Sequence, residues 1–358
     1  MDEEIDEWRD GVNRTILATL GSVTAAMVPV GAASHDITRT IANVAEGGKR
    51  LRSILLLASH HAHGGTSPHA AVALGAALEL FHTGALLHDD ILDDSDTRRG
   101  QPSAHRRFAS HHKDKGWEGD PLAFGNAGAI LAGDVALMAA TRALHTATAL
   151  LPSPASGQTA DLFHDAVDLV VAGQYLDMQL AAQPIDDLDH QEADILTTIR
   201  AKTAAYTCEA PLALGAASAG ADKAAIDGVR EAGMHLGLAF QLRDDVLGIT
   251  GDPSVTGKPS GDDIREGKRT LLVWYAWGRA DQGQRSTLKK ALGVRAAPDS
   301  DVAAAVEVVR QVGALDAVEE EISSTLILAL DRFERLRLEE PYASLLRRIA
   351  KDAVDRDR

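Results

Sequence analysis

The sequence predicts an all-α protein, a bundle of antiparallel helices joined by short connections. Hydrophobic residues make up 45% of the 358 residues but aromatic residues only 4%, so alanine and leucine must fill the core, which favours closely packed helices. Apolar residues recur at helical spacing along most of the chain, and no strand-like alternation of useful length is found. Because there is no internal repeat or low-complexity linker, we expect residues 1–358 to form a single domain.

The first part of the chain is predicted to form long helices separated by polar loops. Residues 5–31 and 36–63 show helical spacing, and the loop HGGTSPH ends the second helix. A third helix is expected over residues 72–98. Residues 100–120 are rich in His, Lys and Gly, so we expect a surface loop there, with a mobile lid as the alternative.

Helical patterns continue through the rest of the chain. They cover residues 125–151, 160–182, 195–218 and 228–250. The sequence PSPASG separates the first two of these helices. Residues 251–267 are rich in Gly, Pro and charged groups and are predicted to form a loop. The remainder, to Arg358, is predicted to form amphipathic helices divided by GVRAAPDSD.

Composition and charge exclude several classes of function. The net charge of −16 argues against a nucleic-acid or anionic membrane partner, although local basic residues can still bind a small anionic substrate. A single cysteine, Cys208, excludes an intrachain disulfide and suits a reducing cytoplasm. The N-terminal MDEEIDEWRD is acidic, so we expect no secretion signal. The apolar region 127–151 is interrupted by Asp134, Arg142 and His145, which predicts a buried helix and no membrane span.

The most distinctive acidic stretch is HDDILDDSDTRRG, which begins at His88. On a helix Asp89 and Asp93 lie on one face, and Asp90 lies about 100° round the axis. Adjacent carboxylates repel, so a cation is expected to bind them. Mg²⁺ suits this stretch because one or two carboxylates and substrate phosphates usually hold it. A solvated acidic face is the alternative, whereas an EF-hand calcium loop is excluded because its glycine and terminal Glu are missing.

Basic residues of the type that binds phosphate occur in two places. Arg98 and Arg99 follow the acidic stretch directly, and paired guanidinium groups suit phosphate oxygens. Lys49 and Arg52 in GGKRLR are three residues apart, close enough on a helix to grip one diphosphate together. Ordinary solvated surface residues are the alternative interpretation of GGKRLR.

A second acidic pair, Asp244 and Asp245, stands in FQLRDDVLGITGD on a helix-like background. Two such clusters on facing helices can hold metal ions between them. With these motifs the chain resembles the trans-isoprenyl diphosphate synthases, the polyprenyl synthetase family, whose first motif is DDxxD followed by RRG and whose second lies in a QxRDD context. The resemblance extends over nearly the whole chain through GGKRLR, GQYLD, KT and GDPSVTGKPSGDDIREGKRT. Several motifs in family order are more specific than a single DDxxD.

The resemblance implies the isoprenoid synthase fold, a helical bundle around a central cavity, and head-to-tail prenyl transfer. An allylic diphosphate loses pyrophosphate, the double bond of isopentenyl diphosphate attacks the allylic cation, and the departing pyrophosphate can take the proton. The family also implies Mg²⁺, three ions with the bound allylic diphosphate, and a homodimer in the cytoplasm.

The resemblance assigns roles to individual residues. The metal ligands are Asp89, Asp93 and Asp244, with Asp90 and Asp245 as further candidates. The allylic diphosphate is contacted by Arg98, Lys202 and Lys258. Isopentenyl diphosphate is held by Lys49, Arg52, His82 and Arg99. Thr203 and Gln241 face the cation, and Gln174 and Asp177 lie near the catalytic Lys202. Taken alone, a histidine such as His82 is more often a packed side chain, and the GQYLD pair more often a solvated one.

The second acidic motif departs from the family pattern. Gly248 stands where the third aspartate is common, and Asp252 lies four residues further on. We expect activity to survive, because Asp244 alone can bind a metal whose shell phosphate and water complete.

The residues before Asp89 bear on product length. In the family the positions four and five before the motif are often aromatic when products are short, and here they are Ala85 and Gly84. The first layer of the cavity is therefore expected to be open. Phe81 lies roughly 12 Å from the motif along the helix axis and is expected to form the cavity floor, with ordinary core packing as the alternative. Geranylgeranyl diphosphate is the predicted product, and a chain of C25 or longer is the alternative.

Two other classes of function fit less well. A class I terpene cyclase shares DDxxD, but it needs no second diphosphate site and the chain has no N-D-x-x-S-x-x-x-E motif. A non-catalytic partner subunit of a heteromeric synthase would be expected to lose its aspartates or GGKRLR, and both are present.

Overall fold

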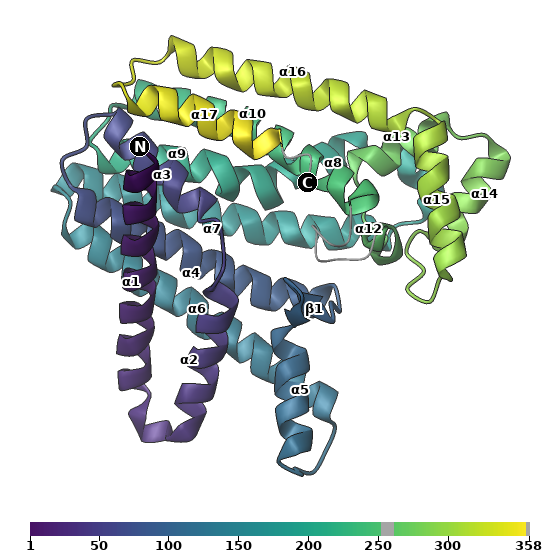
Figure 1. The fold of residues 1–358 in the computed structure, drawn as a ribbon, viewed down its shortest axis with the longest axis horizontal. Coiled ribbons are helices and arrows are strands. Elements are labelled where there is room, and N and C mark those ends of the chain that lie inside the picture. Colours follow the sequence, from purple (N-terminus) through teal and green to yellow (C-terminus); the bar gives the residue numbers. More distant parts are fainter. Residues whose placement is uncertain (252–260, 356–358) are drawn as a thin grey trace. The chain divides into compact units, whose positions relative to one another are not determined.

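The computed structural model describes residues 1–251 and 261–355. The described chain is helical apart from one short ribbon of two-residue strands, so the predicted all-α class is confirmed (Figure 1). Its contacts divide it into two compact units. The first unit comprises Met1–Leu162, Ala213–Asp222 and Glu339–Tyr342, and the second comprises Phe163–Leu212, Lys223–Leu338 and Ala343–Arg358. The single domain expected from the sequence stays a prediction.

The first unit is built around the long helix α4. Its elements are α1 (Asp2–Ala26), η1 (Val28–Val30), α2 (Ala32–Ala45), α3 (Leu51–Ala62), α4 (Pro68–Leu92), β1 (Thr97–Arg98), β2 (Gln101–Pro102), α5 (Ala104–Asp114) and α6 (Pro121–Ala149). Helices α1, α2, α3 and α6 pack against α4, most of whose residues are buried. Helices α7 (Ser153–Ala182) and α9 (Ala210–Ser218) contribute residues to both units.

Glycines allow α4 and α6 to pack closely along each other, as Figure 1 shows. A Cβ atom at Gly84 would lie 2.9 Å from Cδ2 of Leu137, and one at Gly133 would lie 2.1 Å from Nε2 of His88. The Nε2 atom of His88 also lies 3.1 Å from the backbone oxygen of Ile130. This part of α4 therefore has a fixed position on α6.

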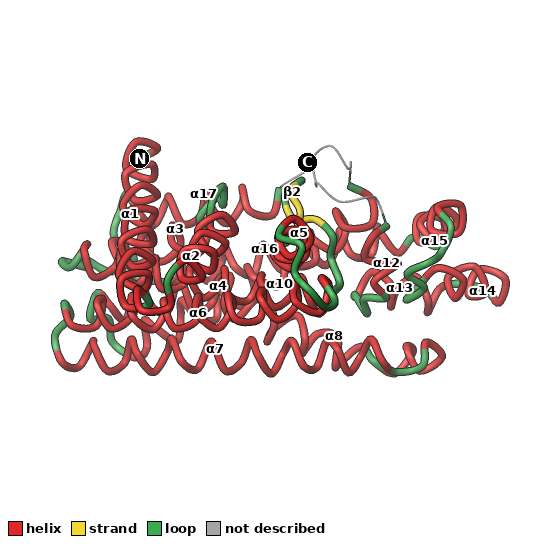
Figure 2. Tube along the Cα trace, turned by 90° about the horizontal axis from the view of Figure 1, so that it is seen from below, coloured by secondary structure: helices red, strands yellow, loops and turns green. Residues whose placement is uncertain are grey.

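The segment after the acidic motif differs from the sequence prediction. Helix α4 ends at Leu92, short of the expected residue 98, and the β1–β2 ribbon follows, the yellow segment in Figure 2. Residues 104–114 form the helix α5, so the prediction of a loop over 100–120 was wrong. Packing explains the difference, because α5 lies so close to α6 that a Cβ at Gly125 would be 2.3 Å from the backbone oxygen of His105. Tertiary contacts here override weak local propensity.

Helix α6 is less buried than the sequence suggested. Ile130, Leu131 and Met138 on one face are 46%, 56% and 62% exposed, so the prediction that this region is a buried helix was wrong for that face. Among the described residues, α4 and α6 are the helices long and apolar enough to cross a membrane by length and composition. The apolar window of α4 is 78% buried and that of α6 is 33% buried.

The second unit is centred on α10 (Lys223–Thr250). Its other elements are η2 (Ile185–His190), α8 (Glu192–Thr198), the π-helical segment η3 (Ile199–Glu209), α12 (Asp262–Glu266), α13 (Leu271–Arg279), α14 (Gln282–Ala291), α15 (Asp299–Gln311), α16 (Ala314–Arg335) and α17 (Tyr342–Val354). Arg243 of α10 ties two other helices to it, because it pairs with Glu319 of α16 and its Nε donates to the backbone oxygen of Val354, 3.0 Å away. These contacts fix the helix that carries the second acidic motif.

Candidate active site

Asp89 and Asp93 lie at the C-terminal end of α4, one helical turn apart as predicted. Asp93 caps the helix, and its backbone N–H donates to the backbone oxygen of Asp89 at 2.8 Å. Both residues are partly exposed, and the side chain of Asp89 retains 26% of its surface. Two carboxylates at a helix end, each reachable from solvent, have the disposition that a hydrated Mg²⁺ requires.

Asp90, in contrast, is fully buried and anchors Arg98. The Nε and Nη2 atoms of Arg98 lie 2.7 and 2.6 Å from Oδ1 of Asp90, and Nη2 lies 3.8 Å from Oδ2 of Asp89. Burial opposes ionisation of Arg98, but its hydrogen bond to Asp90 and the nearby carboxylates raise its pKa above the ordinary value. Asp90 has no surface to offer a hydrated ion, so its geometry favours an anchor over the metal ligand proposed as a further candidate.

The remaining carboxylates of the acidic stretch are neutralised by α5. Arg106 lies 2.9 Å from Asp94 and 2.6 Å from Asp96 through its Nη2 and Nε atoms. This pairing could not be predicted from the sequence, because Arg106 follows in a segment predicted to be a loop. Three of the acidic side chains in this stretch are thus paired with arginines, which relieves the repulsion around Asp89 and Asp93.

The GGKRLR motif contains a structural arginine that the sequence analysis missed. Arg50 is 8% exposed, and its guanidinium donates to Asn13, to the backbone oxygen of Ala45 and to Glu79 at 2.9, 2.7 and 3.2 Å. Glu79 in turn accepts from the hydroxyl of Ser53 at 2.8 Å. A buried ion pair with all these partners fixes the start of α3 and hence the neighbouring Lys49 and Arg52.

The structure brings together most of the residues predicted to hold isopentenyl diphosphate. Burial lowers the pKa of His82 well below its ordinary value, and the nearby Arg52, Arg98 and Arg99 lower it further. Burial and the other arginines likewise lower the pKa of Arg99, whose Nη1 donates to the backbone oxygen of Glu46 at 2.5 Å. The arginines repel one another and so favour a bound anion, while the lowered pKa favours the neutral form of His82 beside them.

The backbone of the GGKRLR turn passes close to two of the arginine side chains. A Cβ atom at Gly48 would lie 3.5 Å from Nη2 of Arg99 and 3.5 Å from Nη1 of Arg50, so the GGKRLR turn contacts the second arginine of the RRG motif. Lys49, the next residue, is exposed. We refer to Lys49, Arg52, His82 and Arg99 as the basic group of the first unit.

In the second unit Lys202 lies on the π-helical segment η3. Its Nζ donates to Oδ2 of Asp177 at 2.6 Å, which pairs the KT lysine with the GQYLD aspartate. A Cβ at Gly173 would lie 2.5 Å from the backbone nitrogen of Lys202, so the motif glycine allows α7 to touch η3. On the other side, a Cβ at Gly237 of α10 would lie 2.5 Å from Cα of Ala204. The π-helical turn is therefore clamped between two helices, a setting in which such segments often serve function.

Gln241 and Asp245 form a pair on α10. The Nε2 atom of Gln241 donates to Oδ1 of Asp245 at 2.7 Å, which leaves the amide oxygen to point elsewhere. Burial raises the pKa of Asp245 well above its ordinary value, the hydrogen bond from Gln241 opposes this, and Asp263 and Asp244 add to it. A 5% exposed carboxyl that resists ionisation suits the positioning of Gln241 better than the binding of a metal.

Asp244, the residue before Asp245, is partly exposed. One turn further along, the space beside Gly248 is filled by another aspartate: a Cβ there would lie 2.0 Å from Oδ2 of Asp263 on α12. Asp263 was not among the predicted site residues, although its GDDIREGK context is part of the family motif. Lys258 and Asp252 lie outside the described residues.

The donor set fits Mg²⁺ that is shared with a diphosphate. Within the described residues, no three acidic, His or Cys side chains converge to hold a metal alone. Partly exposed single carboxylates beside arginine and lysine are what Mg²⁺ uses when phosphate oxygens and water complete its shell. Held by Asp89 and Asp93 in the first unit, or by Asp244 in the second, Mg²⁺ would supply positive charge to a leaving pyrophosphate.

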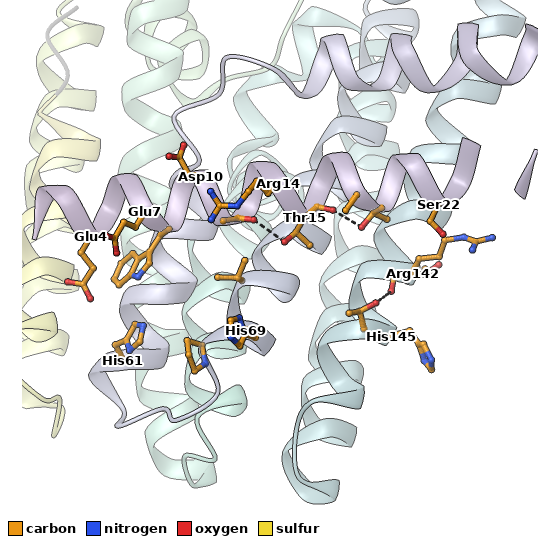
Figure 3. A pocket seen from close by; sticks show the side chains of 18 residues that line it. Glu4, Glu7, Asp10, Arg14, Thr15, Ser22, His61, His69, Arg142 and His145 are labelled. Atoms are coloured by element: carbon orange, nitrogen blue, oxygen red, sulfur yellow. Dashed lines mark hydrogen bonds between the residues drawn. The ribbon is translucent and has the colours of Figure 1, made fainter. Parts of the chain in front are cut away.

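A large groove elsewhere in the first unit is not this site. It has a volume of about 1450 Å³ and runs along α1, with Glu4, Glu7 and His61 towards one end and Arg142 and His145 towards the other (Figure 3). None of the residues predicted to bind metal or diphosphate lines it. This groove is therefore not assigned a role in catalysis.

Comparison with known proteins places these residues in a family. The Polyprenyl synthetase family profile matches residues 36–309, which contain every predicted site residue. The chain belongs to the polyprenyl synthetase family. It is therefore a prenyltransferase, and the resemblance inferred from the motifs is confirmed.

Individual relatives agree with this assignment. The chain is 36% identical to the geranylgeranyl diphosphate synthase of Sulfolobus acidocaldarius over 74% of both chains. It is also 36% identical to the geranylfarnesyl diphosphate synthase of Aeropyrum pernix, over 76% of this chain and 79% of the relative. The crystal structure of geranylgeranyl pyrophosphate synthase from Corynebacterium glutamicum, complexed with isoprenyl diphosphate and magnesium, has a TM-score of 0.90 at 34% identity. That match covers 98% of this chain and 99% of the other.

Proposed function

We propose that this prenyltransferase joins isopentenyl diphosphate head to tail to an allylic diphosphate, with Mg²⁺ as cofactor and geranylgeranyl diphosphate as its main product. The observation that carries the proposal is the basic group of the first unit beside the Arg98–Asp89 contact. One cationic cluster thus stands next to a separate arginine and carboxylate pair, as two different diphosphates require.

The residues divide the reaction between them. The basic group would hold the diphosphate of isopentenyl diphosphate, which does not ionise. Arg98 and Lys202 would meet the allylic diphosphate, whose C–O bond breaks with the electron pair leaving on pyrophosphate. The double bond of isopentenyl diphosphate then forms the new C–C bond to the allylic carbon. The isopentenyl unit loses a proton, which passes to the pyrophosphate. Thr203 and the amide oxygen of Gln241 would face the allylic cation, where apolar walls must exclude water.

The structure changes the argument about product length. The space left at Gly84 is not open, because Leu137 of α6 fills it, so the expectation of an open first layer was wrong at that position. Ala85 remains partly exposed, and Phe81 is 3% exposed on the same stripe of α4. These positions support a channel that passes Ala85 and ends near Phe81, which suits a C20 product. A C25 or longer product is the alternative, favoured by the geranylfarnesyl diphosphate synthase relative.

Product analysis tests the proposal directly. The purified enzyme is supplied with Mg²⁺, labelled isopentenyl diphosphate and the C5 allylic starter dimethylallyl diphosphate, and the products are dephosphorylated and separated by chain length. We expect C20 from the wild type, longer chains from Phe81→Ala and shorter chains from Ala85→Phe. If Phe81→Ala folds normally and keeps the wild-type product, Phe81 is not the floor.

The same assay separates the rival classes. Allylic diphosphate alone should give no hydrocarbon, whereas a terpene cyclase would release one. A non-catalytic subunit would form no product from either substrate mixture. Loss of turnover when Mg²⁺ is chelated, and its return when Mg²⁺ is added, checks the cofactor. The proposed three ions can be counted by metal analysis of a complex with a non-ionisable allylic analogue.

We further propose that the enzyme is a cytoplasmic homodimer. The exposed apolar face of α6, formed by Ile130, Leu131 and Met138, supports this because such a face is usually covered by another protein surface. Light scattering should give twice the mass of one chain, and Met138→Glu should shift it towards the monomer. A monomer at micromolar concentration in the wild type would contradict the proposal.

A further inference from the structure

The second acidic motif lacks a carboxylate on its own helix. Asp244 and Gly248 are four residues apart on α10, so they lie on the same face of the helix. Cβ atoms at two such positions are about 5–6 Å apart. At Gly248 this face has no side chain. An aspartate here would present its carboxylate beside that of Asp244.

Asp263 occupies this place from a different helix. Its Oδ2 and Cγ atoms lie 2.0 and 2.9 Å from where a Cβ at Gly248 would stand, so the whole carboxylate sits against the glycine. Contacts between α12 and α10 hold it there. A Cβ at position 248 would push this carboxylate out of its present place. The glycine therefore leaves room for the aspartate of α12 on the face that carries Asp244.

Asp263 shares one ammonium group with a second carboxylate. Its Oδ1 accepts from Nζ of Lys268 at 2.9 Å, and the same ammonium lies 2.6 Å from Oε2 of Glu266. One ammonium therefore serves two carboxylates, and the side chain of Asp263 keeps 14% of its surface. Two carboxylates and one ammonium leave a net negative charge here.

We propose that Asp263 supplies from α12 the carboxylate that α10 lacks at Gly248, and that it acts with Asp244 in binding diphosphate-bound Mg²⁺. The inference rests on the proposed role of Asp244. It assigns a function to Gly248 as well, since the glycine and the aspartate form a complementary pair. Direct or water-mediated contact would both serve, because Mg²⁺ keeps several waters.

The test measures Mg²⁺ binding without turnover. Thermal unfolding is followed during Mg²⁺ titrations at a fixed, saturating concentration of inorganic pyrophosphate, and the half-saturating Mg²⁺ concentration is read from the shift in Tm. The variants are Asp263→Ala, Gly248→Ala and the exchange Gly248→Asp/Asp263→Ala. Asp227→Ala is the control, because it removes an exposed aspartate of α10 whose side chain pairs with Lys223.

We expect Asp263→Ala and Gly248→Ala each to raise the half-saturating Mg²⁺ concentration by about tenfold or more, the usual effect of removing a group that supports a metal. Gly248→Ala is informative because alanine favours a helix over glycine by about 1 kcal/mol, so a loss of Mg²⁺ affinity cannot come from a weaker helix. The exchange should return the value to within about threefold of wild type. The control should leave it unchanged.

Three results would overturn the inference. One is a wild-type Mg²⁺ response in Asp263→Ala. Another is an exchange variant that stays folded and recovers nothing. The third is an Asp263→Ala variant whose only change is a lower Tm in the absence of Mg²⁺. Asp263 would then serve only as an ion-pair partner of Lys268. A wild-type enzyme that binds Mg²⁺ and pyrophosphate but makes no prenyl product would instead refute the proposed function.

Discussion

The glycine of the GQYLD motif offers a quantitative test of how Lys202 is positioned. In Gly173→Ala the new Cβ would lie 2.5 Å from the backbone nitrogen of Lys202 and 2.8 Å from the carbonyl carbon of Ala201. Both are backbone atoms, so η3 or α7 must move by several tenths of an ångström or more. Overpacking of this kind destabilises by about 1–3 kcal/mol. A shift of about 1 Å in a catalytic group can lower a rate by roughly 100-fold.

Gly157 provides the matched control. It lies in the same helix, α7, and a Cβ there would meet nothing within 4 Å. Gly157→Ala should therefore gain up to about 1 kcal/mol from helix propensity and leave turnover unchanged. Because the propensity gain is common to both variants, the difference between them isolates the clash.

The assays are urea unfolding and steady-state condensation. We expect Gly173→Ala to be less stable than Gly157→Ala by about 1–3 kcal/mol and to lose most of its kcat. The KM for isopentenyl diphosphate should change little, because Lys202 is not one of the residues assigned to that substrate. If the two variants match in stability and in kcat, close packing of η3 does not position Lys202.

Three further outcomes are expected. Asp93→Ala should abolish condensation at unchanged helicity by circular dichroism, and wild-type turnover in a folded variant would refute its assignment to Mg²⁺. Arg52→Met should raise the KM for isopentenyl diphosphate, whereas Arg98→Met should weaken the allylic substrate and lower kcat; identical effects on both substrates would contradict the division. Burial and His61 lower the pKa of the fully buried His60 from 6.5 to about 4. Its folded pKa lies below its unfolded value, so stability should be intact above pH 6.5 and fall by up to roughly 3 kcal/mol as the pH drops towards 4. Urea unfolding of wild type and His60→Gln across this pH range measures how the free energy of unfolding depends on pH. Parallel curves for the two proteins would show that His60 is not the source of the pH dependence.

The chemistry of the site and the class of the fold could both be predicted from sequence. Apolar residues at helical spacing and the absence of strand alternation are local signals, and the helices they predict were found. The GQYLD motif, expected near Lys202, places Asp177 2.6 Å from the Nζ atom of that lysine. Asp89 and Asp93 share a face because four residues make about one turn, whatever the rest of the chain does.

Only the tertiary structure decided which residues of each motif have a structural role and which can bind substrate or metal. Arg50 and Arg52 look equivalent in GGKRLR, but Arg50 is buried and pairs with Glu79, whereas Arg52 is partly exposed. Asp89 and Asp90 are neighbours, but burial pairs Asp90 with Arg98. These partners are distant in sequence, and whether they meet depends on how helices pack, which spacing along one helix cannot encode. For the same reason the missing aspartate at position 248 looked like a loss in the sequence, whereas in the folded chain another helix fills its place.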